Sequence, residues 1–163
     1  EKGIEVRGLD AEKHLVEADA DLIHQVVYNL VDNAVKFVQQ GGYLEFGYRN
    51  DGGMTFISVK NSGEGVAPEE IPKLFDRFYK SDKSRSLDKN GVGLGLSIVK
   101  TIVNLHNGEI FVRSEPGQYT EFVFSLPTSQ QNKKSLLFRK HDKQPPREAP
   151  GQSQQDPGRG TKP

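Results

Sequence analysis

A single segment near the N-terminus constrains the fold most strongly. Residues 18–42 repeat apolar side chains with the period of an α-helix, about 100° per residue. Asp19 or Asp21 can cap the start of this helix, and Gly41 can end it. Seven apolar residues fall on one side: Ile23, Val26, Val27, Leu30, Val31, Ala34 and Val38. So wide an apolar side predicts a helix that lies on a second layer of structure.

The segments around this helix predict that the second layer is a β-sheet. Alternating apolar and polar residues predict strands at 3–8, 14–18, 43–48, 54–60, 109–115 and 119–127. Short polar turns join the last four segments into two hairpins. Between the hairpins we expect a short helix around Pro68–Leu74 and a long helix over Leu94–His106, closed by Asn107-Gly108. This order implies an α+β sandwich, with one mixed sheet covered on one face by helices.

Charge divides the chain into two parts. Residues 1–128 hold 14 Lys and Arg against 19 Asp and Glu, a balance of −5, whereas residues 129–163 hold 8 against 3, a balance of +5. We therefore expect one globular domain over 1–128, whose acidic balance argues against nucleic-acid binding. The polar, basic segment 129–163 is expected to be disordered. The absence of cysteine excludes thiol catalysis, and no apolar run approaches the ~20 residues that span a bilayer.

The first helix carries a polar stripe opposite its apolar side. Asn29 and Asn33 are four residues apart, and Lys36 follows three residues later, so the three share one face. Asp32 lies beside Asn33 but is expected to be rotated away from the centre of the stripe. Amide oxygens are hard ligands that suit Mg²⁺, and a neighbouring lysine suits a phosphate. The alternative is that the stripe is simply the solvent-exposed side of an amphipathic helix.

The stretch NGVGLGLSIVK (90–100) places three glycines before the second long helix. Glycine lets the backbone adopt positive φ and approach a ligand closely, and a helix N-terminus attracts phosphate. The alternative is a loop that only caps the helix. The spacing differs from the GxxxxGK[ST] phosphate loop, and no predicted strand precedes it as in a dinucleotide-binding unit.

Taken together, these segments resemble a known family. NLVDNAVKF (29–37), VKNSGEGV (59–66), LFDRFYKSDKSR (74–85), GVGLGLSIVK (91–100) and GQYTEFVFSLP (117–127) resemble, in order, the N, G1, F, G2 and G3 boxes of sensor histidine kinases. The resemblance implies the Bergerat or GHKL fold, an α/β sandwich with about three helices in which ATP lies under a mobile lid. The five basic residues of 76–93 suggest that this lid is poorly ordered without nucleotide and closes on the triphosphate.

The resemblance also assigns roles to residues. Asn33, with Asn29 beside it, would bind Mg²⁺, and Asn29, Asn33, Lys36 and Arg85 would form the catalytic group. Asn61 stands where the family usually has an aspartate that accepts a hydrogen bond from adenine, so we expect ATP binding to persist, in weakened form. The remaining nucleotide-contacting positions implied by the boxes are Phe37, Gly63, Gly65, Phe75, Arg77, Phe78, Gly91, Val92, Gly93, Leu94, Gly95, Leu96 and Thr120.

The implied activity is transfer of the γ-phosphoryl group of Mg-ATP to a histidine. Relatives that hydrolyse ATP carry a glutamate where this chain has Asn29, and an amide cannot act as a general base, so transfer is favoured over hydrolysis. None of the four histidines fits the phosphoacceptor pattern, so the acceptor is expected on a dimerisation domain absent from this chain. A response-regulator receiver domain would be the indirect partner. The setting would be the bacterial cytoplasm, without membrane contact by this segment.

Two other functions remain open at this point. One is a serine kinase that resembles anti-sigma factors, and the other is a pseudokinase that binds nucleotide or a partner without transfer. Asn61 is the only feature that supports the pseudokinase.

Overall fold

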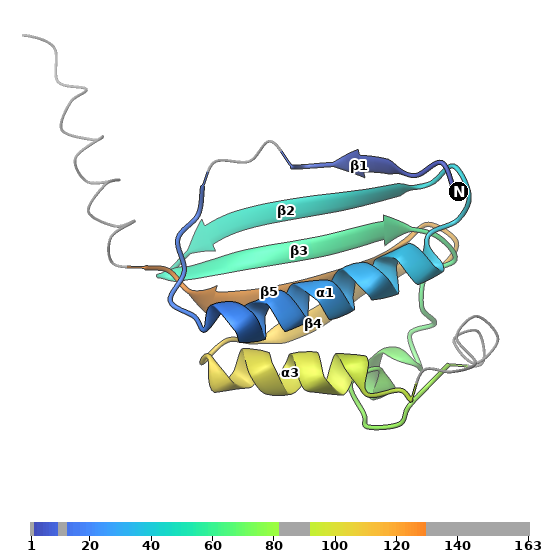
Figure 1. Cartoon of the computed structure of the whole chain (residues 1–163). Helices are drawn as coiled ribbons and strands as arrows, with labels where there is room; N and C mark the ends of the chain where they lie inside the picture. The colour runs from blue at the N-terminus through green and yellow to red at the C-terminus, as the bar shows by residue number, and fades with distance from the viewer. Residues whose placement is uncertain (1, 10–12, 82–91, 130–163) are drawn as a thin grey trace, which may run out of the picture.

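In the residues that the structure describes, a five-stranded mixed sheet has two α-helices packed on one face (Figure 1). The computed structural model describes residues 2–9, 13–81 and 92–129. The strands lie in the order β1-β2-β3-β5-β4, with β1 parallel to β2 and the other neighbours antiparallel. The elements are β1 (Glu5–Arg7), α1 (Ala20–Phe37), β2 (Tyr43–Asp51), β3 (Met54–Ser62), the 3-10 helix η1 (Ile71–Lys73), α3 (Gly95–Leu105), β4 (Ile110–Glu115) and β5 (Tyr119–Pro127). The predicted α+β sandwich is confirmed.

The core lies between the two helices and the sheet. Most of the predicted apolar side of α1 is buried or half-buried, although Val27 is 37% exposed, and Val26 and Leu30 are fully buried. They pack with Val99 of α3 and with Phe122 and Phe124 of β5. Burying a side chain of this size stabilises the fold by about 1.5–3 kcal/mol. This core therefore fixes α1 and α3 side by side over the centre of the sheet.

The start of α1 and the end of α3 follow the predicted signals. Asp19 caps α1, since its Oδ1 accepts a hydrogen bond from the Leu22 N–H at 3.0 Å. Helix α3 ends at Leu105, and Asn107 then takes positive φ (56°), a C-terminal conformation that Asn tolerates. Asn107-Gly108 therefore closes α3 as predicted. Within the described residues, neither α-helix has both the length and the hydropathy needed to cross a bilayer.

Three predicted elements are corrected by the structure. Helix α1 ends at Phe37, four residues before Gly41, because Val38 is already extended with ψ 135°. The predicted strand at 14–18 is reduced to a single bridge between Val16 and Thr128. The helix expected around Pro68–Leu74 is one 3-10 turn, a form in which such short helices are common.

Both predicted hairpins are present, and the first is longer than predicted. Strands β2 and β3 continue to Asp51 and from Met54, and the two glycines between them take φ of 57° and 86°. A conformation of this kind at two successive positions is typical of tight hairpin turns. The β2–β3 pairing therefore includes residues 49–51, which lie beyond the alternating apolar residues used to predict the strand.

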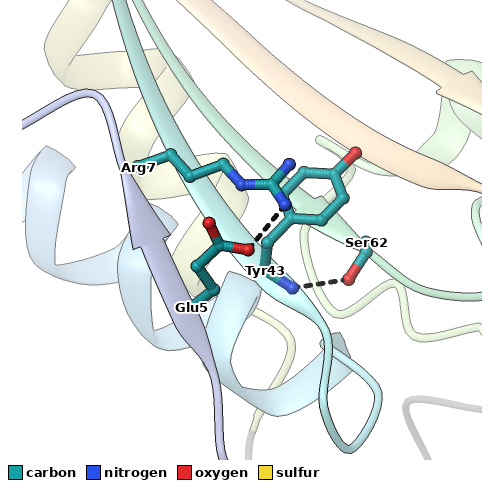
Figure 2. A network of polar contacts seen from close by, with 4 residues as sticks. All are labelled: Glu5, Arg7, Tyr43 and Ser62. Atoms are coloured by element: carbon teal, nitrogen blue, oxygen red, sulfur yellow. Dashed lines mark hydrogen bonds and ion pairs between the residues drawn. The ribbon is translucent and has the colours of Figure 1, made fainter.

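The edge formed by β1, β2 and the end of β3 is joined by polar contacts (Figure 2). Arg7 donates a hydrogen bond to Glu5 at 2.6 Å, and its guanidinium lies 4.2 Å from the centre of the Tyr43 ring. This hydrogen bond lowers the pKa of the Glu5 carboxyl from its ordinary value. The Tyr43 N–H donates to Ser62 Oγ at 2.8 Å. A Cβ at Gly42 would lie 2.3 Å from that oxygen, so glycine leaves room for the contact that holds the end of β3.

Candidate functional site

The predicted site residues that the structure describes gather at one end of the molecule. The C-terminal end of α1, the C-terminal end of β3 and the N-terminal end of α3 all lie there, because the two helices run in opposite directions (Figure 1). Arg85 and Gly91 lie outside the described residues, as does most of the predicted lid. The segment expected to be disordered is 129–163, and all of it beyond Ser129 also lies outside the described residues.

The amide stripe of α1 faces the start of α3. Asn29 and Asn33 are both half-buried. A Cβ built on Gly95 would lie 3.5 Å from Asn29 Oδ1. The structure thus brings the first member of the stripe against the last glycine of the glycine-rich stretch. A ligand held by the stripe would meet the N-terminal end of α3, which favours negative charge.

Lys36 is held by an ion pair within α1. Its Nζ lies 2.7 Å from Asp32 Oδ2, one helical turn away, and both side chains are about two-fifths exposed. Asp32, expected to turn away from the centre of the stripe, is therefore the partner of the stripe's cation. The i, i+4 spacing was a sequence signal for this pair, since such pairs meet on a helix surface. A phosphate at this position would compete with Asp32 for the ammonium group.

The end of β3 meets the end of α1. A Cβ on Gly63 would lie 2.7 Å from the Phe37 carbonyl oxygen and 3.5 Å from Asn61 Nδ2, so only glycine permits this approach. Asn61 is 2% exposed and donates through Nδ2 to the Ser62 carbonyl at 3.1 Å. In the sheet register Asn61 lies opposite Thr120, which is also buried. Three predicted positions, Phe37, Gly63 and Asn61, are thus in contact distance, with Thr120 beside them.

The turn at Gly65 reaches the final hairpin. Gly65 has φ 71°, and a Cβ there would lie 2.6 Å from the Glu115 carbonyl oxygen. The N–H of the next residue, Val66, donates to Ser114 Oγ at 2.8 Å, and this oxygen lies 3.4 Å from Thr120 Oγ1. Sequence reasoning did not include Ser114, which lies in an ordinary alternating strand and carries no local signal.

The two aromatic residues of the F box differ in their surroundings. Phe75 is partly buried and packs edge-on against Phe122, with ring centres 6.4 Å apart, so its side chain contributes to the core. Phe78 is 68% exposed, has φ 64°, and donates through its N–H to the Gly93 carbonyl at 3.0 Å. The F segment is therefore anchored to the core at one residue and tied to the glycine-rich stretch at another.

A shallow pocket lies between the F segment and the N-terminal half of α3. Its volume is about 390 Å³, and it is lined by Arg77, Phe78, Leu94, Ser97, Ile98, Thr101 and Ile102. Arg77, Phe78 and Leu94 are predicted site residues, whereas Asn29, Asn33 and Lys36 do not line it. Val92 is 63% exposed, and Leu96 is packed against the core.

The donor chemistry of the stripe is compatible with Mg²⁺ bound jointly with a phosphate. Among the described residues, no three His, Cys, Asp or Glu side chains cluster in a way that could hold a metal ion. Mg²⁺ is usually held by few protein oxygens, together with water and the phosphates of a substrate. The half-buried amides of Asn29 and Asn33 fit that pattern. The described residues do not provide the carboxylate or histidine cluster of a site built from protein ligands alone.

Comparison with known proteins finds similarity to histidine kinases in both sequence and structure. The family model described as "Histidine kinase-, DNA gyrase B-, and HSP90-like ATPase" matches residues 18–130. The sensor histidine kinase WalK of Bacillus subtilis (strain 168) is 39% identical over 124 residues, which are 75% of this chain and 20% of WalK. The chain thus spans about a fifth of the length of this curated relative.

Solved structures of histidine kinases share the fold. The nucleotide-free catalytic domain of histidine kinase ThkA is 30% identical with a TM-score of 0.66, and the match covers 78% of this chain and 82% of ThkA. Full-length ShkA in complex with AMPPNP is 32% identical with a TM-score of 0.66, and the match covers 78% of this chain and 26% of ShkA.

Proposed function

Because the chain belongs to the family of histidine kinase-, DNA gyrase B- and HSP90-like ATPases, we propose that it binds Mg-ATP and donates the γ-phosphoryl group to a histidine. The domain is the ATP-binding catalytic domain found in sensor histidine kinases. The acceptor histidine would lie on a dimerisation domain outside this chain, and a response-regulator receiver domain would take the phosphoryl group next.

The observation that supports this proposal most directly is the contact between the amide stripe and the glycine-rich stretch. Asn29 lies against Gly95, so the stripe of α1 and the N-terminus of α3 face one space. Asn33 and Lys36 would hold the phosphate end of ATP there, and Asn61 with Thr120 would hold the adenine end. ShkA, with the same fold, has been solved with AMPPNP, a nucleotide analogue.

Within this site the chain's own residues would bind and orient the substrate. Asn33, with Asn29, would hold Mg²⁺, which offsets phosphate charge when bound. Lys36 would leave Asp32 for a phosphate oxygen, and Arg85 would add a second cation. In phosphoryl transfer the protein contributes mainly positioning and charge stabilisation, and an amide at Asn29 gives water no general base. The domain would therefore transfer rather than hydrolyse.

The proposal is tested in two stages. Titration calorimetry with Mg-ATP measures binding by the chain alone. Radiolabelled ATP is then added together with the histidine-containing dimerisation domain of a sensor kinase, supplied in trans. We expect label on that domain that is lost in acid, as phosphohistidine is. Acid-stable label would indicate a serine kinase, and binding without transfer to any acceptor would indicate a pseudokinase.

A further inference from the structure

The N-terminal segment contacts the site end of α1 through one side chain. The ammonium group of Lys2 donates hydrogen bonds to the carbonyl oxygens of Val35 at 2.8 Å, Lys36 at 3.0 Å and Val38 at 3.1 Å. In Figure 1 the start of the chain lies beside the C-terminal end of α1 and the loop that leads to β2. One cation therefore binds three of the four carbonyls of residues 35–38, which include that of Lys36, the proposed phosphate ligand.

Two of these carbonyls, those of Val35 and Lys36, belong to the last turn of α1, where carbonyls have no intrahelical partner. The Ala34 carbonyl accepts from the Val38 N–H at 2.9 Å, and the Phe37 carbonyl lies against Gly63. The carbonyls of Val35 and Lys36 accept from Lys2. Lys2 thus replaces N–H donors that another helical turn would supply, and so supports the end of α1 at Phe37, although Val38 still fits the apolar period.

The position of Lys2 is fixed by its own backbone. Its carbonyl accepts a hydrogen bond from the Gly41 N–H at 2.8 Å, and the Glu5 N–H donates to the Gly42 carbonyl at 2.9 Å. Two backbone hydrogen bonds therefore join residues 2–5 to residues 41–42. The backbone of Lys2 is therefore held by the loop that follows α1, which places the ammonium group over the helix end.

The charge at this helix end is relevant to the proposed ligand. The C-terminus of a helix carries about half a negative charge, which disfavours a phosphate near its last turn. Within that turn the ammonium of Lys36 is shared with Asp32. The Lys2 cation offsets the negative helix end, and it also fixes the backbone from which the Lys36 side chain extends.

We propose that Lys2 is a positioning residue for the phosphate end of the nucleotide site. This inference rests on the proposed function. Lys2 does not touch the substrate; it holds the last turn of α1 and offsets its charge, so that Lys36 and Asn33 can accept a polyphosphate. Its loss should therefore weaken binding of the triphosphate more than binding of the nucleoside.

Three variants of the full 163-residue chain test this role. Lys2→Met removes the charge and the donors, Lys2→Arg keeps both, and Lys13→Met is a control at another exposed lysine of the N-terminal segment. Calorimetry measures affinity for Mg-ATP and for adenosine. We expect Lys2→Met to weaken Mg-ATP binding about threefold to fivefold and adenosine binding less than about twofold. Lys2→Arg and Lys13→Met should bind both like the wild type.

Amide exchange at Val38 provides a readout that needs no ligand. We expect faster exchange there in Lys2→Met, because the last turn loses its cap. Equal losses for ATP and adenosine, or unchanged ATP affinity, would overturn the inference. Unchanged exchange at Val38 in Lys2→Met would also overturn the inference, whether or not the wild type binds nucleotide. Failure of the wild type to bind Mg-ATP would count against the proposed function instead. If Lys2→Met did not fold, Lys2→Gln, which keeps an N–H donor without charge, would replace it.

Discussion

Gly93 combines two constraints that a side chain would violate. Its φ is 75°, and a Cβ there would lie 2.9 Å from the Tyr79 carbonyl oxygen and 3.0 Å from the Phe78 carbonyl carbon. Gly117 has almost the same φ, 79°, but nothing lies within 4 Å of its Cβ position. Substitution of Gly117 would therefore cost free energy through backbone conformation alone, whereas substitution of Gly93 would add the cost of steric crowding.

We predict that Gly93→Ala weakens Mg-ATP binding, because the F segment must move away from the glycine-rich stretch. Gly117→Ala should leave nucleotide affinity unchanged. Each change should lower the free energy of unfolding by about 1 kcal/mol through positive φ, with a further loss for Gly93. Chemical denaturation and calorimetry measure both effects. Equal affinities in the two variants would show that close approach at Gly93 does not serve the ligand.

Asn33 is the residue expected to contact the metal. We predict that Asn33→Ala removes most of the part of ATP affinity that depends on Mg²⁺, since it removes the amide oxygen. Calorimetry with and without Mg²⁺ checks this, and Asn104→Ala, at an exposed asparagine of α3, is the matched control. Equal losses in the two conditions would argue against a metal role for Asn33.

At this scale, the sequence predicted residues that have regular spacing or lie in the five boxes, and it missed residues outside both patterns. Asn29, Asn33 and Lys36 share a helix face by periodicity alone, and the structure places Asn29 of that face against Gly95. Lys2 and Ser114 reach the site only through tertiary contacts, across 33 to 36 residues for Lys2 and 48 for Ser114. No local pattern records such contacts, because nothing in the short segment around either residue depends on them.

At the scale of elements, His106 joins the far ends of the two α-helices. Its Nε2 lies 3.0 Å from the Asp19 N–H at the start of α1, and its Nδ1 lies 2.8 Å from the Ile102 carbonyl of α3. An amide N–H can only donate and a carbonyl can only accept. The ring must therefore be the neutral tautomer with its proton on Nδ1 to make both bonds.

We predict that nitrogen NMR at alkaline pH detects the Nδ1–H tautomer of His106. His106→Ala should lower the free energy of unfolding by about 1 kcal/mol for the lost hydrogen bonds. His24→Ala, at an exposed histidine of α1, should change it by less than about 0.5 kcal/mol. A ring protonated on Nε2 would contradict the link between the helices.

The elements with strong periodicity were predictable, and those set by tertiary contacts were not. Both hairpins and both α-helices follow from alternation, apolar period and turn residues. The segment around Val16 alternates like a strand but forms only one bridge among the described residues, because alternation alone does not specify a pairing partner. The end of α1 depends on Lys2 and Gly63, which lie far from it in sequence.

At the scale of the whole molecule, a ligand that binds only the folded state must stabilise it. We predict that Mg-ATP at about one hundred times its dissociation constant adds roughly 2.7 kcal/mol, or roughly 5–15 °C in melting temperature. Thermal unfolding followed by circular dichroism measures this shift. Tripolyphosphate with Mg²⁺ is the control for general anion effects, and an equal shift with it would contradict recognition of the nucleoside.

The position of β5 between β3 and β4 also has a consequence for synthesis of the chain. Strand β3 is made early, but its second edge stays open until β5 arrives, up to Pro127. Closing so long a loop makes this pairing a late and entropically costly step. Until then Asn61 has no Thr120 beside it, and an exposed strand edge can pair with another nascent chain. A ribosome that stalls before Tyr119 would therefore release a product without an adenine end and with an aggregation-prone edge, a natural substrate for chaperones and proteases.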